Sequence, residues 1–136
     1  MNATRTFIDT NILIYAFSTD EPTKQKIALE ILDNCLPVIS TQVVKEFSNV
    51  LLRKKKVSLQ NLEEIIAGIM EVADVVNEEV EFILTAFDIH KRYQFSFYDS
   101  LVVATALASN CKILLSEDMN DGQVIEDTLK IVNPFK

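Results

Sequence analysis

A small set of acidic residues has the types and positions that could do chemistry: Asp9, Glu46, Asp99 and Asp118. Each lies beside or within an apolar stretch, where a carboxylate costs free energy unless it is paired or binds a cation. If the fold brings them together, their repulsion would raise their pKa values unless a cation compensates. Oxygen ligands suit Mg²⁺ or Mn²⁺, which can activate water and stabilise charge on a phosphate. The pattern therefore predicts metal-assisted hydrolysis of phosphodiesters.

Two of these acids also have a purely structural interpretation. Asp9 lies between Ile8 and the apolar stretch 12–17, so its side chain could simply cap the turn that follows. Glu46 falls at the edge of the apolar face of a predicted helix, where Lys45 or Asn49 could satisfy it. Both interpretations stay open at this level.

The other two acids present the same choice. Asp99 points along the apolar face of a predicted helix, but Ser96 and Asp99 also have the spacing of a capping box. Asp118 follows a predicted strand and could belong to an acidic turn. Glu117 and Asp121 compete with it for any role in a site.

Charge and composition limit the function classes. The net charge of −7 argues against binding nucleic acid across the whole surface. Basic residues are concentrated in the run Arg53, Lys54, Lys55 and Lys56, which could contact a nucleic acid or form a solvated helix C-terminus.

Several other kinds of site are excluded by residue type. The single histidine, His90, and the distant cysteines Cys35 and Cys111 cannot form a structural zinc site. No Ser-His-Asp set, Walker loop or glycine-rich phosphate loop is present. No apolar run approaches the roughly 20 residues of a membrane span, and the N-terminus is wrong for a signal peptide. We therefore expect a soluble, cytoplasmic protein with no membrane association.

Short apolar strands alternate with helices along the chain. Strands are expected at residues 6–8, 37–39, 74–76, 112–115 and 130–132, with helices between them and a nearly all-apolar helix at 97–108. This alternation predicts one α/β domain over residues 1–136, with a parallel sheet covered on both faces. Ligands bind outside the carboxyl ends of such strands, where Asp9 and the segment 116–118 are expected.

These segments together resemble the PIN-domain nucleases, most closely the toxins of VapC-type toxin–antitoxin pairs. The similarity rests on Phe7–Ala16, on Glu46 in the helix after the second strand, on Phe97–Leu101 and on Leu114–Met119. The four segments occur in the family's order and span almost the whole chain.

The resemblance implies a three-layer α/β/α fold with a five-stranded parallel sheet. It implies a Mg²⁺- or Mn²⁺-dependent ribonuclease whose metal is held by Asp9, Glu46, Asp99 and Asp118. Asn11 and Ser116 would orient acids or water, with Asp121 as an alternative to Asp118. It further implies an RNA substrate cut to 5′-phosphate and 3′-hydroxyl ends, an antitoxin partner and a homodimer. Local basic patches such as Arg53, Lys54 and Lys55 would then bind the RNA.

Two other classes compete with the nuclease: a binding module, of which a receiver-like domain is one kind, and a phosphatase. A non-catalytic α/β binding module could keep the acidic pocket as an ion or partner site, and metal binding without nuclease activity would identify it. A receiver-like domain needs a late Lys near the pocket, whereas Lys112 and Lys130 begin their strands. A phosphatase with Asp9 as nucleophile is disfavoured because Asn11 stands where a second Asp would be expected.

Overall fold

The computed structural model describes residues 3–136, which form six strands and six helices. The strands are β1 (Arg5–Ile8), β2 (Leu36–Ser40), β3 (Asp74–Val76), β4 (Ile113–Leu115), β5 (Val124–Ile125) and β6 (Leu129–Val132). The helices are α1 (Thr10–Ala16), α2 (Pro22–Asn34), α3 (Thr41–Arg53), α4 (Leu59–Val72), α5 (Val80–Tyr93) and α6 (Phe97–Ala108). No helix among the described residues is long and apolar enough to cross a membrane.

The strands form one sheet in the order β3-β2-β1-β4-β6-β5. The five strands expected from the sequence are all parallel, whereas β5 pairs antiparallel with β6. The expected count of five is therefore corrected to six. The missed strand has only two residues, too few for a hydrophobic period to show in the sequence.

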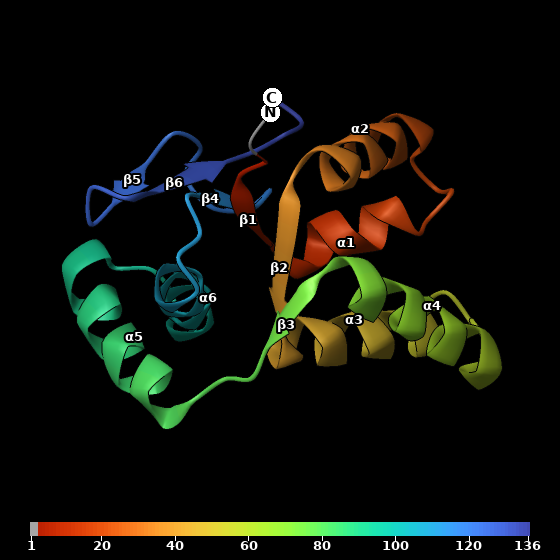
Figure 1. The fold of residues 1–136 in the computed structure, drawn as a ribbon, viewed down its shortest axis with the longest axis horizontal. Helices are drawn as coiled ribbons and strands as arrows, with labels where there is room; N and C mark the ends of the chain where they lie inside the picture. The colour runs from red at the N-terminus through yellow and green to blue at the C-terminus, as the bar shows by residue number, and fades with distance from the viewer. Residues whose placement is uncertain (1–2) are drawn as a thin grey trace.

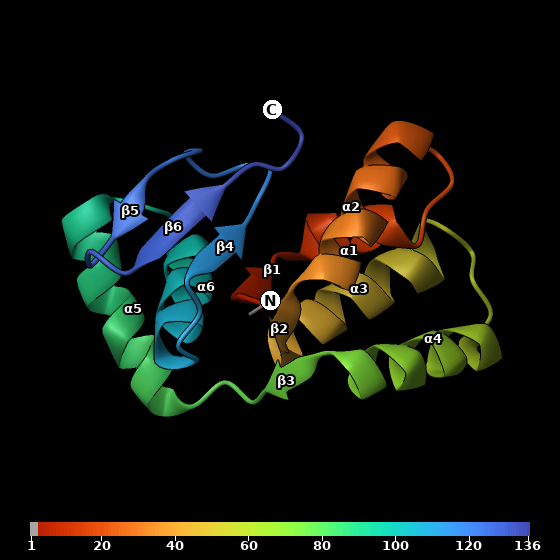
Figure 2. The same cartoon turned by 45° about the horizontal axis from the view of Figure 1, so that its top comes forward.

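The sheet separates two groups of helices, as the three-layer prediction requires. Figures 1 and 2 show α1 to α4 together on one side and α5 with α6 on the other. The chain moves outward from β1 to β2 and β3, then crosses back to β4 on the far side of β1. Because parallel crossovers are right-handed, this change of direction puts the later helices on the opposite face.

Serine caps fix where three of the helices begin. The side chains of Ser40, Ser58 and Ser96 each accept a hydrogen bond from the backbone N–H three residues ahead, at 3.1 to 3.2 Å. The helix that follows Ser96 is α6, and its residues from Ser100 to Ala106 are all buried. It packs between the sheet and α5, which explains its nearly all-apolar sequence.

The chain changes direction between β1 and β4, which lie side by side at the centre of the sheet. Just beyond β1, the backbone N–H of Asp9 donates to the carbonyl of Leu115 at 3.1 Å. The carboxyl ends of these two strands form the topological switch point, where open α/β sheets bind their ligands. Asp9 and Ser116 are the first residues beyond them.

Candidate active site

Asp9 both caps a helix and has a raised pKa, the two features that the sequence analysis considered for it. Its Oδ1 accepts a hydrogen bond from the Thr10 N–H at 2.9 Å and so caps α1. Burial raises the pKa of Asp9 to about 6, against the lowering effects of the Thr10 N–H and the Ser116 hydroxyl. The charges of Asp99 and Glu46 raise this pKa further. Three of the four acids are therefore close enough to influence one another.

Glu46 reaches the site from α3 through a hydroxyl contact. Its Oε1 accepts a hydrogen bond from Thr10 Oγ1 at 3.2 Å. The residue is more exposed than its place at the edge of an apolar helix face suggested. No ion pair within residues 3–136 involves Glu46, so Lys45 does not neutralise it.

Asp99 occupies the first turn of α6. Its backbone N–H donates to Ser96 Oγ at 3.1 Å, which confirms the predicted cap. The side chain is half-buried and is close enough to raise the pKa of Asp9. The capping interaction uses the backbone of Asp99 and leaves its carboxylate available.

The segment after β4 contains three acids with different partners. Asp118 Oδ2 accepts a hydrogen bond from Asn11 Nδ2 at 3.1 Å. Glu117 is bound by Lys24 and Tyr15, and Asp121 Oδ1 accepts the backbone N–H of Asn133 at 2.8 Å. These contacts favour Asp118 over Glu117 and Asp121, because its partner Asn11 lies only two residues after Asp9.

The donor set suits a hard divalent cation. The side chains at this edge are carboxylates, an amide and hydroxyls, and the buried Ser116 Oγ has no hydrogen-bond partner among the described residues. Ser116 lies near enough to Asp9 to lower its pKa without forming a well-aligned bond. Over residues 3–136, no three Asp, Glu, His or Cys side chains enclose a metal position.

The basic run Arg53–Lys56 does not lie beside the four acids. Arg53 ends α3, seven residues beyond Glu46 and so about 10 Å farther along the helix axis. Arg53 and Lys54 line a surface pocket with Asn49 and Val50. Lys55 forms an ion pair with Asp20, in the loop after α1.

The histidine and the two cysteines, which the sequence analysis did not assign to the site, have structural surroundings. His90 lies in the last turn of α5, with its Nδ1 2.5 Å from the carbonyl oxygen of Phe95. Both cysteines are free, and burial raises the pKa of Cys111 to about 11. A thiol with that pKa is a packing group rather than a nucleophile.

Sequence reasoning missed three residues that support the acids: Thr10, Tyr15 and Lys24. Thr10 could have been suspected, since it stands between Asp9 and Asn11. Tyr15 lies inside an apolar run and looked like a core residue. Lys24 contacts Glu117 across 93 positions of sequence, a separation that no local pattern reveals.

A model of the PIN domain family matches residues 6–120. The chain belongs to the PIN domain family. PIN domains are generally nucleases, and they generally use divalent metals such as Mg²⁺. Asp9, Glu46, Asp99 and Asp118 all fall within the matched residues.

Solved structures share the fold of this PIN domain at low sequence identity. A toxin–antitoxin complex from Klebsiella pneumoniae is 20% identical with a TM-score of 0.69, covering 96% of this chain and 98% of that one. VapBC2 from Rickettsia felis, bound to a promoter DNA fragment, is 14% identical with a TM-score of 0.65, covering 95% and 99%. VapC20 from Mycobacterium tuberculosis, a sarcin-ricin loop cleaving toxin, is 14% identical with a TM-score of 0.62, covering 80% and 86%. No curated protein sequence matches the chain.

Proposed function

We propose that this PIN domain is a cytoplasmic, Mg²⁺- or Mn²⁺-dependent endoribonuclease and the toxin of a type II toxin–antitoxin pair. The observation that carries the proposal is the setting of Asp9. Its carboxylate is half-buried at the switch point of the sheet and lies within the field of two further acids, Glu46 and Asp99. Within residues 3–136 none of these three carboxylates forms an ion pair, and such a group fits a divalent cation better than a structural role.

Each residue of the site has a distinct task in this proposal. Asp9, Glu46, Asp99 and Asp118 would hold the ion, with Asp121 committed to the backbone of Asn133. The ion, when bound, supplies an activated water and stabilises negative charge on the phosphate. Thr10 directs Glu46 toward Asp9, and Asn11 directs Asp118. Attack of water on phosphorus and departure of the 3′-oxygen would leave a 5′-phosphate and a 3′-hydroxyl.

The substrate proposed is RNA, held by local positive charge rather than by the acidic surface as a whole. Arg53 ends α3, the helix that carries Glu46, and Lys54 is its C-cap residue; both are exposed. Lys55 is the weaker candidate since it pairs with Asp20. We infer that the phosphates of RNA on one side of the scissile bond contact Arg53 and Lys54.

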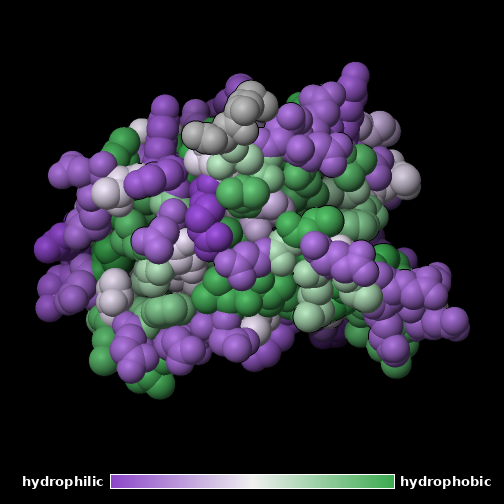
Figure 3. Space-filling model, viewed as in Figure 1, coloured by the Kyte–Doolittle hydropathy of each residue, from purple (hydrophilic) through white to green (hydrophobic). Residues whose placement is uncertain are grey.

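An antitoxin is the proposed partner. Two of the similar structures are toxin–antitoxin complexes, one from Klebsiella pneumoniae and one from Rickettsia felis. This chain offers apolar grooves that such a partner could cover. One is lined by Leu13, Phe17, Leu32, Ile65, Ile69 and Val72. Figure 3 shows hydrophobic side chains at the surface between α2 and α4, where this groove lies. A homodimer is proposed on the family resemblance.

The deciding experiment is cleavage of RNA by protein stripped of metal and then supplied with Mn²⁺. Cleavage should require Mn²⁺ or Mg²⁺, stop on addition of EDTA and be absent from Asp99→Asn. Equal cleavage in EDTA would overturn the metal mechanism. Tight Mn²⁺ binding without cleavage of RNA or single-stranded DNA would instead identify a non-catalytic binding module.

A further inference from the structure

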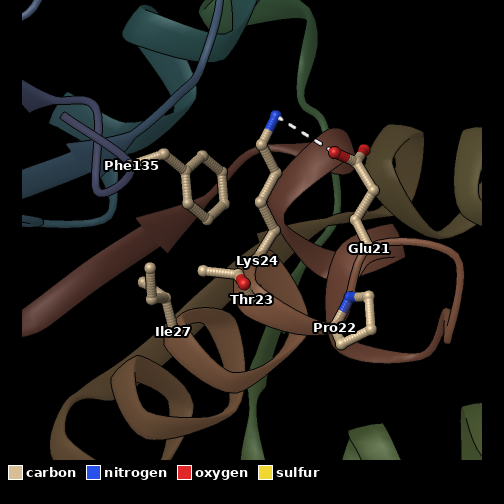
Figure 4. A pocket seen from close by; sticks show the side chains of 6 residues that line it. All are labelled: Glu21, Pro22, Thr23, Lys24, Ile27 and Phe135. Atoms are coloured by element: carbon tan, nitrogen blue, oxygen red, sulfur yellow. Dashed lines mark ion pairs between the residues drawn. The ribbon is translucent and has the colours of Figure 1, made fainter.

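Lys24 joins three segments that are far apart in the sequence. Its Nζ lies 2.5 Å from Glu117 Oε2 and 3.3 Å from the Tyr15 hydroxyl, and that hydroxyl donates to Glu117 Oε1 at 2.7 Å. The ammonium also lies 4.7 Å from the Tyr15 ring centre and 5.2 Å from that of Phe135. Figure 4 shows the Lys24 side chain beside the Phe135 ring, with Glu21 as a more distant ion partner at 3.9 Å.

This cluster is partly shielded from solvent. The side chains of Lys24 and Glu117 are only 29% and 23% exposed, so water screens their attraction less than at an open surface. The Tyr15 ring also packs edge to face on Phe135, at 5.2 Å between centres. An ion pair with a hydrogen bond and two aromatic contacts holds its geometry better than an isolated surface pair.

Glu117 lies directly between two residues of the candidate active site, Ser116 and Asp118. Its carbonyl oxygen accepts a hydrogen bond from Asn133 Nδ2 at 3.2 Å, so both its backbone and its side chain are held. One face of α1 contacts the segment twice: Asn11 binds Asp118, and Tyr15, four residues later, binds Glu117. The position of Asp118 therefore depends on where Glu117 is fixed.

The cluster also separates two adjacent carboxylates. Lys24 and Tyr15 bind both carboxylate oxygens of Glu117, so its side chain is committed to Lys24. A free Glu117 could compete with Asp118 for the same cation. With Glu117 bound on the side of α2, Asp118 is the acid of this segment that lies against Asn11.

We propose that Lys24, Tyr15 and Glu117 form a clamp that positions Asp118 for the divalent cation. They are positioning residues, since they act through Asp118 and not on the substrate. The inference rests on the proposed function and deepens it by naming what sets the geometry of one metal-binding segment.

The first test measures Mn²⁺ affinity by calorimetry on metal-stripped protein. Lys24→Met should weaken Mn²⁺ binding by roughly 10- to 100-fold, the usual loss when the support of a metal ligand is removed. Lys24→Arg keeps a cation for Glu117 and should recover most of that loss. Arg92→Met is the matched control because it removes the Arg92–Glu126 ion pair at the β5–β6 turn, and it should bind Mn²⁺ like the wild type.

The second test asks whether Lys24 acts through Asp118. In an Asp118→Asn background, Lys24→Met should cause no further loss of Mn²⁺ affinity, since the ligand it positions is already altered. If the two losses multiply, the clamp does not act through Asp118 and the proposal is overturned. Tyr15→Phe removes one hydroxyl and provides a milder variant if Lys24→Met does not fold.

A third measurement needs no metal. Hydrogen exchange of the backbone amides at 117–121 should be faster in metal-free Lys24→Met than in wild type, and unchanged in Arg92→Met. Wild-type protein that binds no Mn²⁺ and cleaves no RNA would overturn the proposed function itself. Wild type that binds Mn²⁺ while Lys24→Met binds it equally well would overturn the clamp alone.

Discussion

The hydroxyl of Thr10 donates to Oε1 of Glu46 over 3.2 Å and joins the first turn of α1 to the middle of α3. Thr10 is 8% exposed, and its backbone N–H donates a hydrogen bond to Oδ1 of Asp9, the N-cap of α1. One residue thus contacts two acids that come from different elements. This arrangement fixes their relative positions without a cation.

Thr10→Val tests that connection. Valine keeps the branched shape of threonine but cannot donate to Glu46, so Glu46 should become less ordered and Mn²⁺ affinity should fall several-fold. The unfolding free energy should fall by roughly 1.5 to 3 kcal/mol, the range for a hydrogen bond to a charged group. Thr10→Ser, which retains the hydroxyl, is the control. Unchanged Mn²⁺ affinity in Thr10→Val would show that the contact does not organise the site.

Asp9→Asn should stabilise the metal-free protein at neutral pH. The pKa of Asp9 is raised from 3.8 to about 6 on folding, so the folded state holds the proton more tightly than the unfolded chain. Stability should therefore fall as pH rises through this interval, by at most about 3 kcal/mol from this residue. Asparagine keeps the helix cap and removes the charge.

Urea unfolding of both proteins in EDTA checks the sign of that effect. The stability advantage of Asp9→Asn should be present at pH 7. It should disappear below about pH 4, where Asp9 is protonated in both the folded and the unfolded state. Equal stability of the two proteins at pH 7 would contradict the raised pKa.

Addition of divalent metal should reverse the order of stability. Wild-type protein at a Mn²⁺ concentration of about 100 times Kd should gain roughly 2.7 kcal/mol. Asp9→Asn should gain much less because it has lost one proposed ligand. Thermal melting with and without Mn²⁺ measures both gains, and an equal gain in the two proteins would place the ion away from Asp9.

Neutralising the basic run should change the salt dependence of RNA binding. In an inactive Asp99→Asn background, the double variant Arg53→Gln/Lys54→Gln should bind RNA more weakly at low salt. Its slope of log affinity against log salt should be shallower by roughly 1.4, about 0.7 for each lost phosphate contact. Fluorescence anisotropy measures the slope, and Lys26→Gln on α2 is the control. An unchanged slope would move the RNA path away from α3.

The parts of the fold that follow local rules could be predicted from the sequence. Serines at 40, 58 and 96 precede apolar helical spacing, and all three cap helices in the structure. Five short apolar segments became the parallel strands because burial on both faces requires continuous apolar residues. The strand β5 was missed because Val124–Ile125 is too short to carry a pattern.

Asp9, Glu46 and Asp99 were proposed from their apolar or strand-end settings and Asp118 mainly from the family resemblance, but the partners of these acids could not be predicted. Asp118 and Asp121 look equivalent in the sequence, and only contacts with Asn11 and Asn133 distinguish them. The contact of Lys24 with Glu117 depends on how α2 packs beside the segment after β4. Such pairings follow from tertiary structure and leave no spacing signal.

The short strands at the two sides of the sheet have a consequence for assembly. β3 has three residues and β5 has two, so each border exposes few unpaired backbone groups to another chain. Strand addition, the usual route by which sheets recruit a neighbour or aggregate, is therefore disfavoured at both borders. If the proposed partner binds, we therefore expect it to contact side chains on the helices rather than to extend the sheet by backbone hydrogen bonds.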